Sequence, residues 1–78
     1  MEEYLSLNKE EKRHLIKSHI KNLQFTKYNL ELNIIAEQAV DVPNESSIIG
    51  YQMQIEDLVD KESALQNELL LLDSEEKE

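Results

Sequence analysis

The chain has 78 residues, no cysteine and a formal net charge of −9. A chain of this length has room for one small domain that buries little surface, and the lack of cysteine excludes disulfides and thiolate metal sites as sources of extra stability. One glycine and one proline leave almost no turn signals, which excludes a fold of several strands. The composition therefore predicts an all-α protein with a single sharp connection, and its small size favours oligomerisation.

Two features of the sequence bear on location. No apolar run approaches the roughly 18 residues that a membrane-spanning helix needs, and the first residues lack the basic and apolar parts of a secretory signal. We therefore expect a cytoplasmic protein that makes no membrane contact. The abundance of Asn, Ile and Lys is typical of AT-rich genomes such as those of phages and endosymbionts. For a phage-encoded protein the location is the virion or the host cytoplasm.

The first helix is predicted to begin after Asn8. Asn8 and Glu11 have the spacing of a helix cap, in which the Asn8 side chain accepts hydrogen bonds from free backbone N–H groups. No helix-breaking residue follows until the segment 41–44, so we expect an N-terminal arm over residues 1–7 and a helix over residues 8–40. This helix carries a heptad seam, whose members recur at intervals of four and three and include the charged residues Lys27 and Glu37. The seam consists of Ile16, Ile20, Leu23, Lys27, Leu30, Ile34 and Glu37.

A second helix is predicted after a turn at residues 41–44. Pro43 has no backbone N–H and disfavours helix at the residue before it, and Asn44 is a good N-cap for the next helix. We expect this helix over residues 45–73 and a disordered acidic tail over residues 74–78. The helix carries a second heptad seam with one charge: Ile48, Tyr51, Ile55, Leu58, Glu62, Leu65, Leu69 and Leu72.

Gly50 lies inside the second predicted helix. A glycine within a helix costs about 1 kcal/mol relative to alanine. It is either tolerated at this position or marks a close approach by another helix.

The two seams match each other when the chain folds back at the turn. Facing residues of an antiparallel hairpin have numbers with a near-constant sum, and the seams meet this condition with a sum of 88 or 89. Lys27 then faces Glu62, and Glu37 faces Tyr51, whose phenol can donate a hydrogen bond to a carboxylate. A parallel dimer of the second helix would instead bury Glu62 against its own copy. The sequence therefore predicts an antiparallel, coiled-coil-like two-helix hairpin.

Lys27 and Glu62 form the predicted register pair of this hairpin. Desolvation offsets much of the attraction between two such charges, so we expect the pair to be nearly neutral for stability. The pair can still fix the register, because a slide of one helix by a turn would bury each charge against leucines.

A second apolar line lies around the first helix from its seam. With a weaker set on the second helix it forms the predicted association surface, which consists of Phe25, Tyr28, Leu32, Ile35, Ala39, Ile49 and Met53. A patch of several hundred Å² is larger than soluble monomers usually expose. We interpret it as the core of a homodimer that forms a four-helix bundle. The alternative is a groove for the helix of another protein, as in a small phage-encoded regulator that binds a host protein.

The first helix also carries a basic stripe at i+4 spacing, which can track a phosphate backbone: Lys9, Arg13, Lys17 and Lys21. The antiparallel register sets this stripe opposite the acidic end of the second helix, which includes Glu68 and Asp73. Residues 1–30 carry a net charge of +2, and residues 31–78 carry −11. We interpret the stripe as internal charge complementarity, and weak binding of nucleic acid is the third alternative.

No pattern in the chain indicates catalysis or a bound cofactor. His14 and His19 are five residues apart, so they do not share a helix face as two ligands of one metal ion would. The chain has no glycine-rich phosphate loop and no nucleophile motif, and a two-helix hairpin has no interior cleft. We therefore expect no catalytic residue, no metal and no cofactor, and we interpret the chain as a non-catalytic protein–protein interaction or assembly module.

Overall fold

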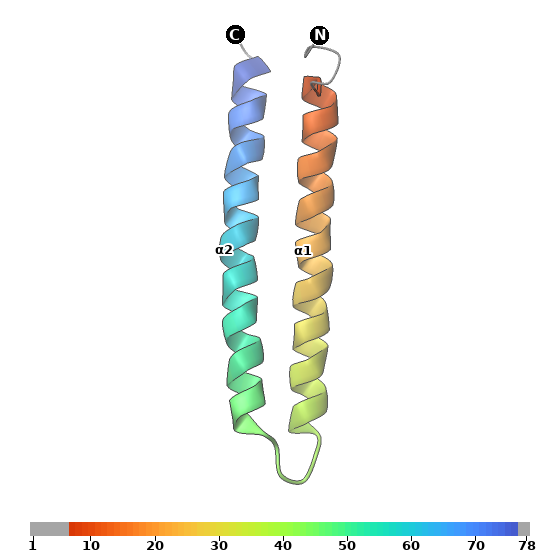
Figure 1. Ribbon diagram of the computed structural model, residues 1–78, viewed down its shortest axis with the longest axis vertical. Coiled ribbons are helices and arrows are strands. Elements are labelled where there is room, and N and C mark those ends of the chain that lie inside the picture. The colour runs from red at the N-terminus through yellow and green to blue at the C-terminus, as the bar shows by residue number, and fades with distance from the viewer. Residues whose placement is uncertain (1–6, 77–78) are drawn as a thin grey trace.

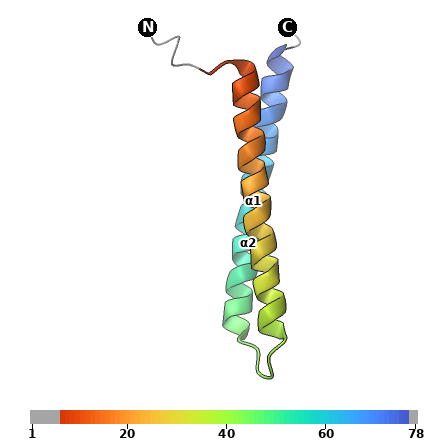
Figure 2. The same cartoon turned by 90° about the vertical axis from the view of Figure 1, so that its right-hand side faces the viewer.

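Two long helices form the part of the chain that the structure describes. The computed structural model describes residues 7–76 and the side chains of residues 7–74. Helix α1 spans Lys9–Gln38 and helix α2 spans Glu45–Glu76. They run side by side in Figure 1, and in the perpendicular view of Figure 2 they overlap and cross each other slightly. The connection, residues 39–44, lies at one end, and the start of α1 and the end of α2 lie at the other, the open end (Figure 1). The predicted all-α antiparallel hairpin is confirmed.

The start of α1 is fixed by Asn8, as the spacing predicts. The Asn8 side chain accepts a hydrogen bond from the Glu11 backbone N–H at 2.8 Å, and the Glu11 carboxylate accepts one from the Asn8 backbone N–H at 2.9 Å. This reciprocal capping box satisfies two N–H groups that the helix itself leaves unpaired. Glu10 and Glu11 in the first turn also interact favourably with the positive end of the helix dipole.

The connection supplies hydrogen-bond partners for the start of α2. Helix α1 ends at Gln38, two residues before its predicted end. The Asn44 side chain accepts a hydrogen bond from the Ser47 N–H at 3.1 Å, which confirms Asn44 as the N-cap. The Glu37 carboxylate accepts one from the Asn44 N–H at 3.1 Å, and this bond ties the last turn of α1 to the cap of α2.

Glu37 therefore has a different partner from the one that the sequence indicates. A hydrogen bond from the Tyr51 phenol was the expectation, but none joins these two residues among the described side chains. A backbone N–H at a helix N-terminus has no acceptor within its own helix, whereas the half-exposed Tyr51 can reach water. The Glu37 carboxylate bonds to the N–H for this reason.

Helix α2 continues beyond its predicted end at residue 73. It runs to Glu76, so residues 74–76 belong to the helix rather than to a disordered tail. Serine and glutamate are compatible with helix, and no Gly or Pro marks an end at residue 73. The remaining predicted tail, residues 77–78, and most of the predicted arm, residues 1–6, lie outside the described residues.

The contact between the helices is made by the two predicted seams. The large apolar side chains that are buried among the described residues, each 8 or 9% exposed, are Ile20, Leu30, Leu58 and Leu72. All four are seam residues. Ile16 and Leu72 line one hollow between the helices, and Leu30 and Leu58 line another. The predicted register places these same pairs opposite each other, so the packing agrees with the sequence pattern.

The hairpin is too thin to have an interior. It measures 60 × 23 × 15 Å, and its radius of gyration of 17.9 Å compares with about 11.5 Å for a compact domain of this length. No described side chain is completely buried. The accessible surface of 6298 Å² exceeds by about 1,400 Å² the area typical of a compact protein of 9.1 kDa. Much of the surface that a globular domain would bury therefore stays in contact with solvent.

Gly50 lies in α2 with open space around it. A Cβ added at this position would meet no atom within 4 Å, so the close-approach interpretation does not apply within the chain.

Gly50→Ala should stabilise the fold by about 0.5–1 kcal/mol, because alanine has the higher helix propensity. A thermal melt followed by circular dichroism should show a rise of a few degrees. A lower melting temperature would mean that another surface packs against residue 50.

Candidate association surface

Many large apolar side chains lie on the outside of the hairpin. Among the described residues thirteen are exposed, whereas four are buried and eight seam side chains are half-buried. The exposed set consists of Leu7, Leu15, Phe25, Tyr28, Leu32, Ile35, Val40, Val42, Ile49, Met53, Val59, Leu70 and Leu71. Single exposed apolar residues are ordinary on protein surfaces, so the informative feature is where these residues cluster.

The densest cluster, the α1 outer face, consists of Phe25, Tyr28, Leu32 and Ile35. Their exposed fractions are 61, 59, 42 and 60% respectively. Each lies one or two positions after a seam residue, so together they occupy the side of α1 that is turned away from α2. Two aromatic and two aliphatic side chains at these exposures present roughly 400 Å² of surface.

One end of the α1 outer face combines a cation with an aromatic ring. Lys21, Gln24, Phe25 and Tyr28 line a shallow hollow of about 240 Å³. The Lys21 Nζ lies 5.9 Å from the centre of the Phe25 ring, which is within the range of a cation–π contact. Such a contact is weak at an exposed site, but it favours conformations of Lys21 in which the ammonium group lies next to the apolar face.

The α2 members of the predicted association surface lie elsewhere. Ile49 and Met53 are exposed, and each lies one or two positions after a seam residue of α2. Because the two seams face each other, the outward sides of the two helices point away from each other. Ala39 is exposed in the connection, next to Val40. The predicted surface therefore consists of an α1 part and an α2 part that do not form one continuous patch.

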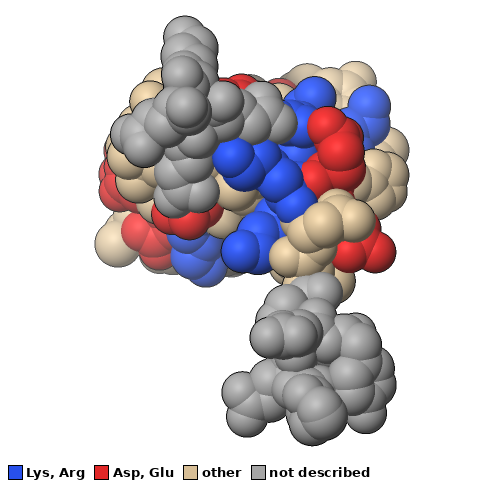
Figure 3. Space-filling model, turned by 90° about the horizontal axis from the view of Figure 1, so that it is seen from above, with Lys and Arg blue, Asp and Glu red and all other residues tan. Residues whose placement is uncertain are grey.

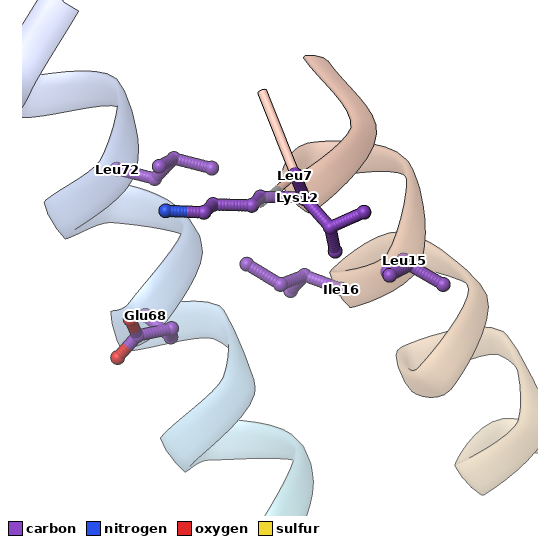
Figure 4. Close-up of a pocket in the computed structure, with 6 residues that line it drawn as sticks. All are labelled: Leu7, Lys12, Leu15, Ile16, Glu68 and Leu72. Atoms are coloured by element: carbon purple, nitrogen blue, oxygen red, sulfur yellow. The ribbon is translucent and has the colours of Figure 1, made fainter. Parts of the chain in front are cut away.

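Another apolar site lies at the open end. Its lining, shown in Figure 4, encloses about 370 Å³ and consists of Leu7, Lys12, Leu15, Ile16, Glu68 and Leu72. The Lys12 side chain extends from α1 toward α2, and Glu68 projects from α2. Sequence reasoning missed this site because Leu7 and Leu15 lie outside the seam. Two leucines off the seam at the start of the first helix were the available signal.

Arg13, a member of the predicted basic stripe, lies in the contact between the helices. Its side chain is only 16% exposed. It donates hydrogen bonds to Asp73 Oδ1 from Nε at 3.1 Å and from Nη2 at 2.8 Å. It also forms an ion pair with Glu10. The guanidinium thus joins two residues that lie 60 positions apart in the sequence, and it holds the two helices together at the open end of the hairpin.

Heptad spacing explains why the basic stripe does not form one open face. Lys9 and Arg13 each lie seven residues before a seam isoleucine, so they extend the seam beyond its apolar part. Lys9 is accordingly half-buried, whereas Lys17 and Lys21 are exposed. Viewed from the open end, Lys and Arg side chains gather beside Asp and Glu side chains (Figure 3). The expected complementarity with the acidic end of α2 is seen at Arg13 and Asp73.

Lys27 and Glu62, the predicted register pair, lie in the same layer of the hairpin. Both are half-buried and line one hollow of about 170 Å³. Glu62 accepts a hydrogen bond from the Gln24 amide at 3.2 Å. The ion pairs found among the described side chains involve Arg13, and none of them joins Lys27 to Glu62. The role of these two charges in fixing the register stays a prediction.

Neither a metal centre nor a membrane span is found in residues 7–74. No group of three or more potential metal ligands comes together there, and His14 and His19 are both exposed. Neither α1 nor the described part of α2 is apolar enough over a sufficient length to cross a membrane. Comparisons of the chain with protein-family models, curated proteins and solved structures found no match.

Arg13 and Asp73 are expected to hold the open end of the hairpin together. Both side chains are partly exposed, so their coupling energy should be about 0.5–1 kcal/mol and should fall in high salt. A double-mutant cycle with Arg13→Gln and Asp73→Asn, followed by denaturant melts, measures this coupling. Lys17→Gln, which removes an exposed charge one turn away, is the control. A coupling near zero at low salt would refute the proposed role.

Charge reversal tests the predicted pairing of Lys27 with Glu62. Glu62→Lys should destabilise the hairpin, because it places two cations in one half-buried layer. Adding Lys27→Glu should restore part of the lost stability. Circular-dichroism melts of the single and double variants give the answer. A double variant no more stable than the worse single variant would show that the two residues do not act as a pair.

Proposed function

We propose that the chain is a non-catalytic assembly module in which the hairpin associates with a second copy of itself to form a homodimer of four helices. The observation that carries the proposal is the number of large apolar side chains left on the outside, thirteen among the described residues, beside four buried and eight half-buried ones in the seams. The α1 outer face is the densest part of this exposed set. Burial of such a face is favourable by roughly 25 cal/mol per Å² of apolar area.

The available surface matches the needs of a dimer. A standard interface buries about 800 Å² on each partner, and somewhat more than half of this area is apolar. The roughly 400 Å² of the α1 outer face corresponds to that apolar share. Interfaces of this size have dissociation constants from picomolar to micromolar, and the flat α1 outer face, which has no deep pocket for an anchoring side chain, corresponds to the micromolar end.

Self-association also supplies stability that a single hairpin lacks. Each helix buries one stripe of side chains, and no described side chain is completely buried. A second copy that binds the folded hairpin and not the unfolded chain stabilises the fold by mass action. Folding and association are coupled for this reason.

Two other functions are alternatives to self-association, and each uses an exposed side of α1. The α1 outer face also fits one amphipathic helix of a different protein, which is the role of a small regulator that captures a host protein. Binding of nucleic acid through the basic stripe is the weaker alternative, because Arg13 is already engaged with Asp73 and Glu10. Both alternatives predict a hairpin that stays monomeric by itself.

Molar mass measured by light scattering across a concentration series tests the proposal. The mass should rise from that of the 9.1 kDa chain to twice this value as the concentration passes through the micromolar range. A constant monomer mass over this range would overturn self-association. It would favour the capture of another protein's helix instead.

Ile35→Glu tests whether the α1 outer face is the surface involved. A glutamate within the apolar face should weaken the dimer at least about tenfold, because association would bury an unpaired charge. Asn33→Glu adds the same charge to the same helix at an exposed position outside the α1 outer face, and it should leave the mass curve unchanged. Neither variant alters the seam, so both should keep their helix content. Equal effects of the two substitutions on the mass curve would contradict the proposed surface.

A further inference from the structure

We propose that the second copy docks on the α1 outer face in an antiparallel orientation, with the two α1 helices side by side and their crossing point near residue 30. Phe25 then lies beside Ile35 of the second copy, and Tyr28 lies beside Leu32 of the second copy. This inference rests on the proposed self-association and adds the docking surface, the orientation and the register of the two copies.

The choice of α1 over α2 follows from the charges along each outward side. From Phe25 to Ala39 the outward line of α1 contains no charged residue. On α2 the exposed apolar residues form one group near each end of the helix, with Val59 alone between them. Glu56 and Asp60 lie between these groups, so two α2 outer sides in contact would bring carboxylates together. The α1 outer face carries no such penalty.

Charge complementarity selects the antiparallel orientation. A parallel pair of α1 helices would set Lys17 and Lys21 beside the same residues of the second copy, where like charges repel. In the antiparallel pair these lysines lie beside the connection of the second copy, next to Asp41 and Glu45. All four side chains are exposed in the single hairpin, so their charges are accessible to a second copy. Two-fold symmetry repeats the contact at both ends of the interface.

The register follows from pairing each large apolar residue with another. When the numbers of facing residues sum to 60, the four members of the α1 outer face pair only with one another. A shift of one heptad sets Tyr28 against the small Ala39 in one direction and Leu32 against Lys21 in the other. The cost of the proposed register is that Glu31 lies near its own copy beside the axis, where both carboxylates remain in water.

This docking mode places the two α1 helices inside the dimer and the two α2 helices outside. The order follows because the α1 outer face is turned away from α2. It differs from a compact bundle, in which the inward stripes of all four helices surround one core. Ile49 and Met53 stay exposed at the outer edges of the dimer, where further helices can pack against them.

Cysteine cross-linking tests the register, because the chain has no cysteine of its own. Asn22→Cys and Ala36→Cys introduce single thiols at exposed positions that flank the α1 outer face and leave its four residues intact. In the proposed register, residue 22 of one copy lies close to residue 36 of the second copy. Each residue lies about 20 Å from its own counterpart, since more than ten residues at 1.5 Å per residue separate them along the helix.

A mixture of the two variants should give a covalent heterodimer with a short bismaleimide linker, whereas neither variant alone should cross-link. Self-linked dimers of either variant would show a parallel pair and overturn the proposal. A heterodimer of Asn29→Cys with Ala36→Cys, identified by its mass, in the absence of the first heterodimer would show a shifted register and overturn it too. Asn29→Cys by itself should form a self-linked dimer, because residue 29 lies next to the two-fold axis in the proposed register. Gln54→Cys, an exposed position on α2, mixed with Ala36→Cys is the control for random collision and should give no product.

Light scattering on the same samples before cross-linking separates this inference from the proposed function. Variants that form dimers but give no product in the Asn22→Cys and Ala36→Cys mixture would overturn the docking mode and leave self-association intact. Monomers at every concentration, for the variants and the unaltered chain alike, would overturn both.

Discussion

The structure depends on a single layer of contact between two helical seams. Each helix, of 30 or 32 residues, can bury only the stripe that faces its neighbour, because no third element among the described residues covers the other sides. Four isoleucine and leucine side chains in this layer are buried, eight further apolar seam side chains are half-buried, and the other sides of each helix face solvent. The extended shape, the large accessible surface and the exposed apolar residues all follow from this constraint.

Most of the fold could be predicted from residue spacing. The Asn8 cap and the Asn44 cap depend on short local patterns, and the structure shows both. The antiparallel match depends on Pro43 and on two heptad seams that are both readable in one chain. The helix ends were less predictable. Helix α1 ends before its predicted last residue, and α2 continues past its own. No Gly or Pro marks either point, and small local energies decide where a terminal turn ends.

The candidate surface could be predicted only in part. The exposure of Phe25 and Ile35 follows from the periodicity of α1, which places both residues on the side of the helix opposite its seam. Their separation from Ile49 requires a second step, in which the two predicted seams are placed face to face. The predicted association surface combined residues of both helices without this step. Arg13 could be predicted more fully. Its i+4 spacing alone assigns it to an exposed stripe, but the antiparallel register sets it opposite the acidic end of α2, and it pairs there with Asp73.

The Glu37–Asn44 hydrogen bond closes the chain over seven residues, whereas the Arg13–Asp73 pair closes it over 60. The entropy lost in closing a loop grows with the number of residues enclosed, so the contact beside the connection forms at the lowest entropic cost. Each further layer then encloses only a few more residues, and the helices close progressively from the connection toward the open end. By the same reasoning the open end should fray first, so we expect amide hydrogens near Arg13 to exchange with solvent faster than those near Glu37.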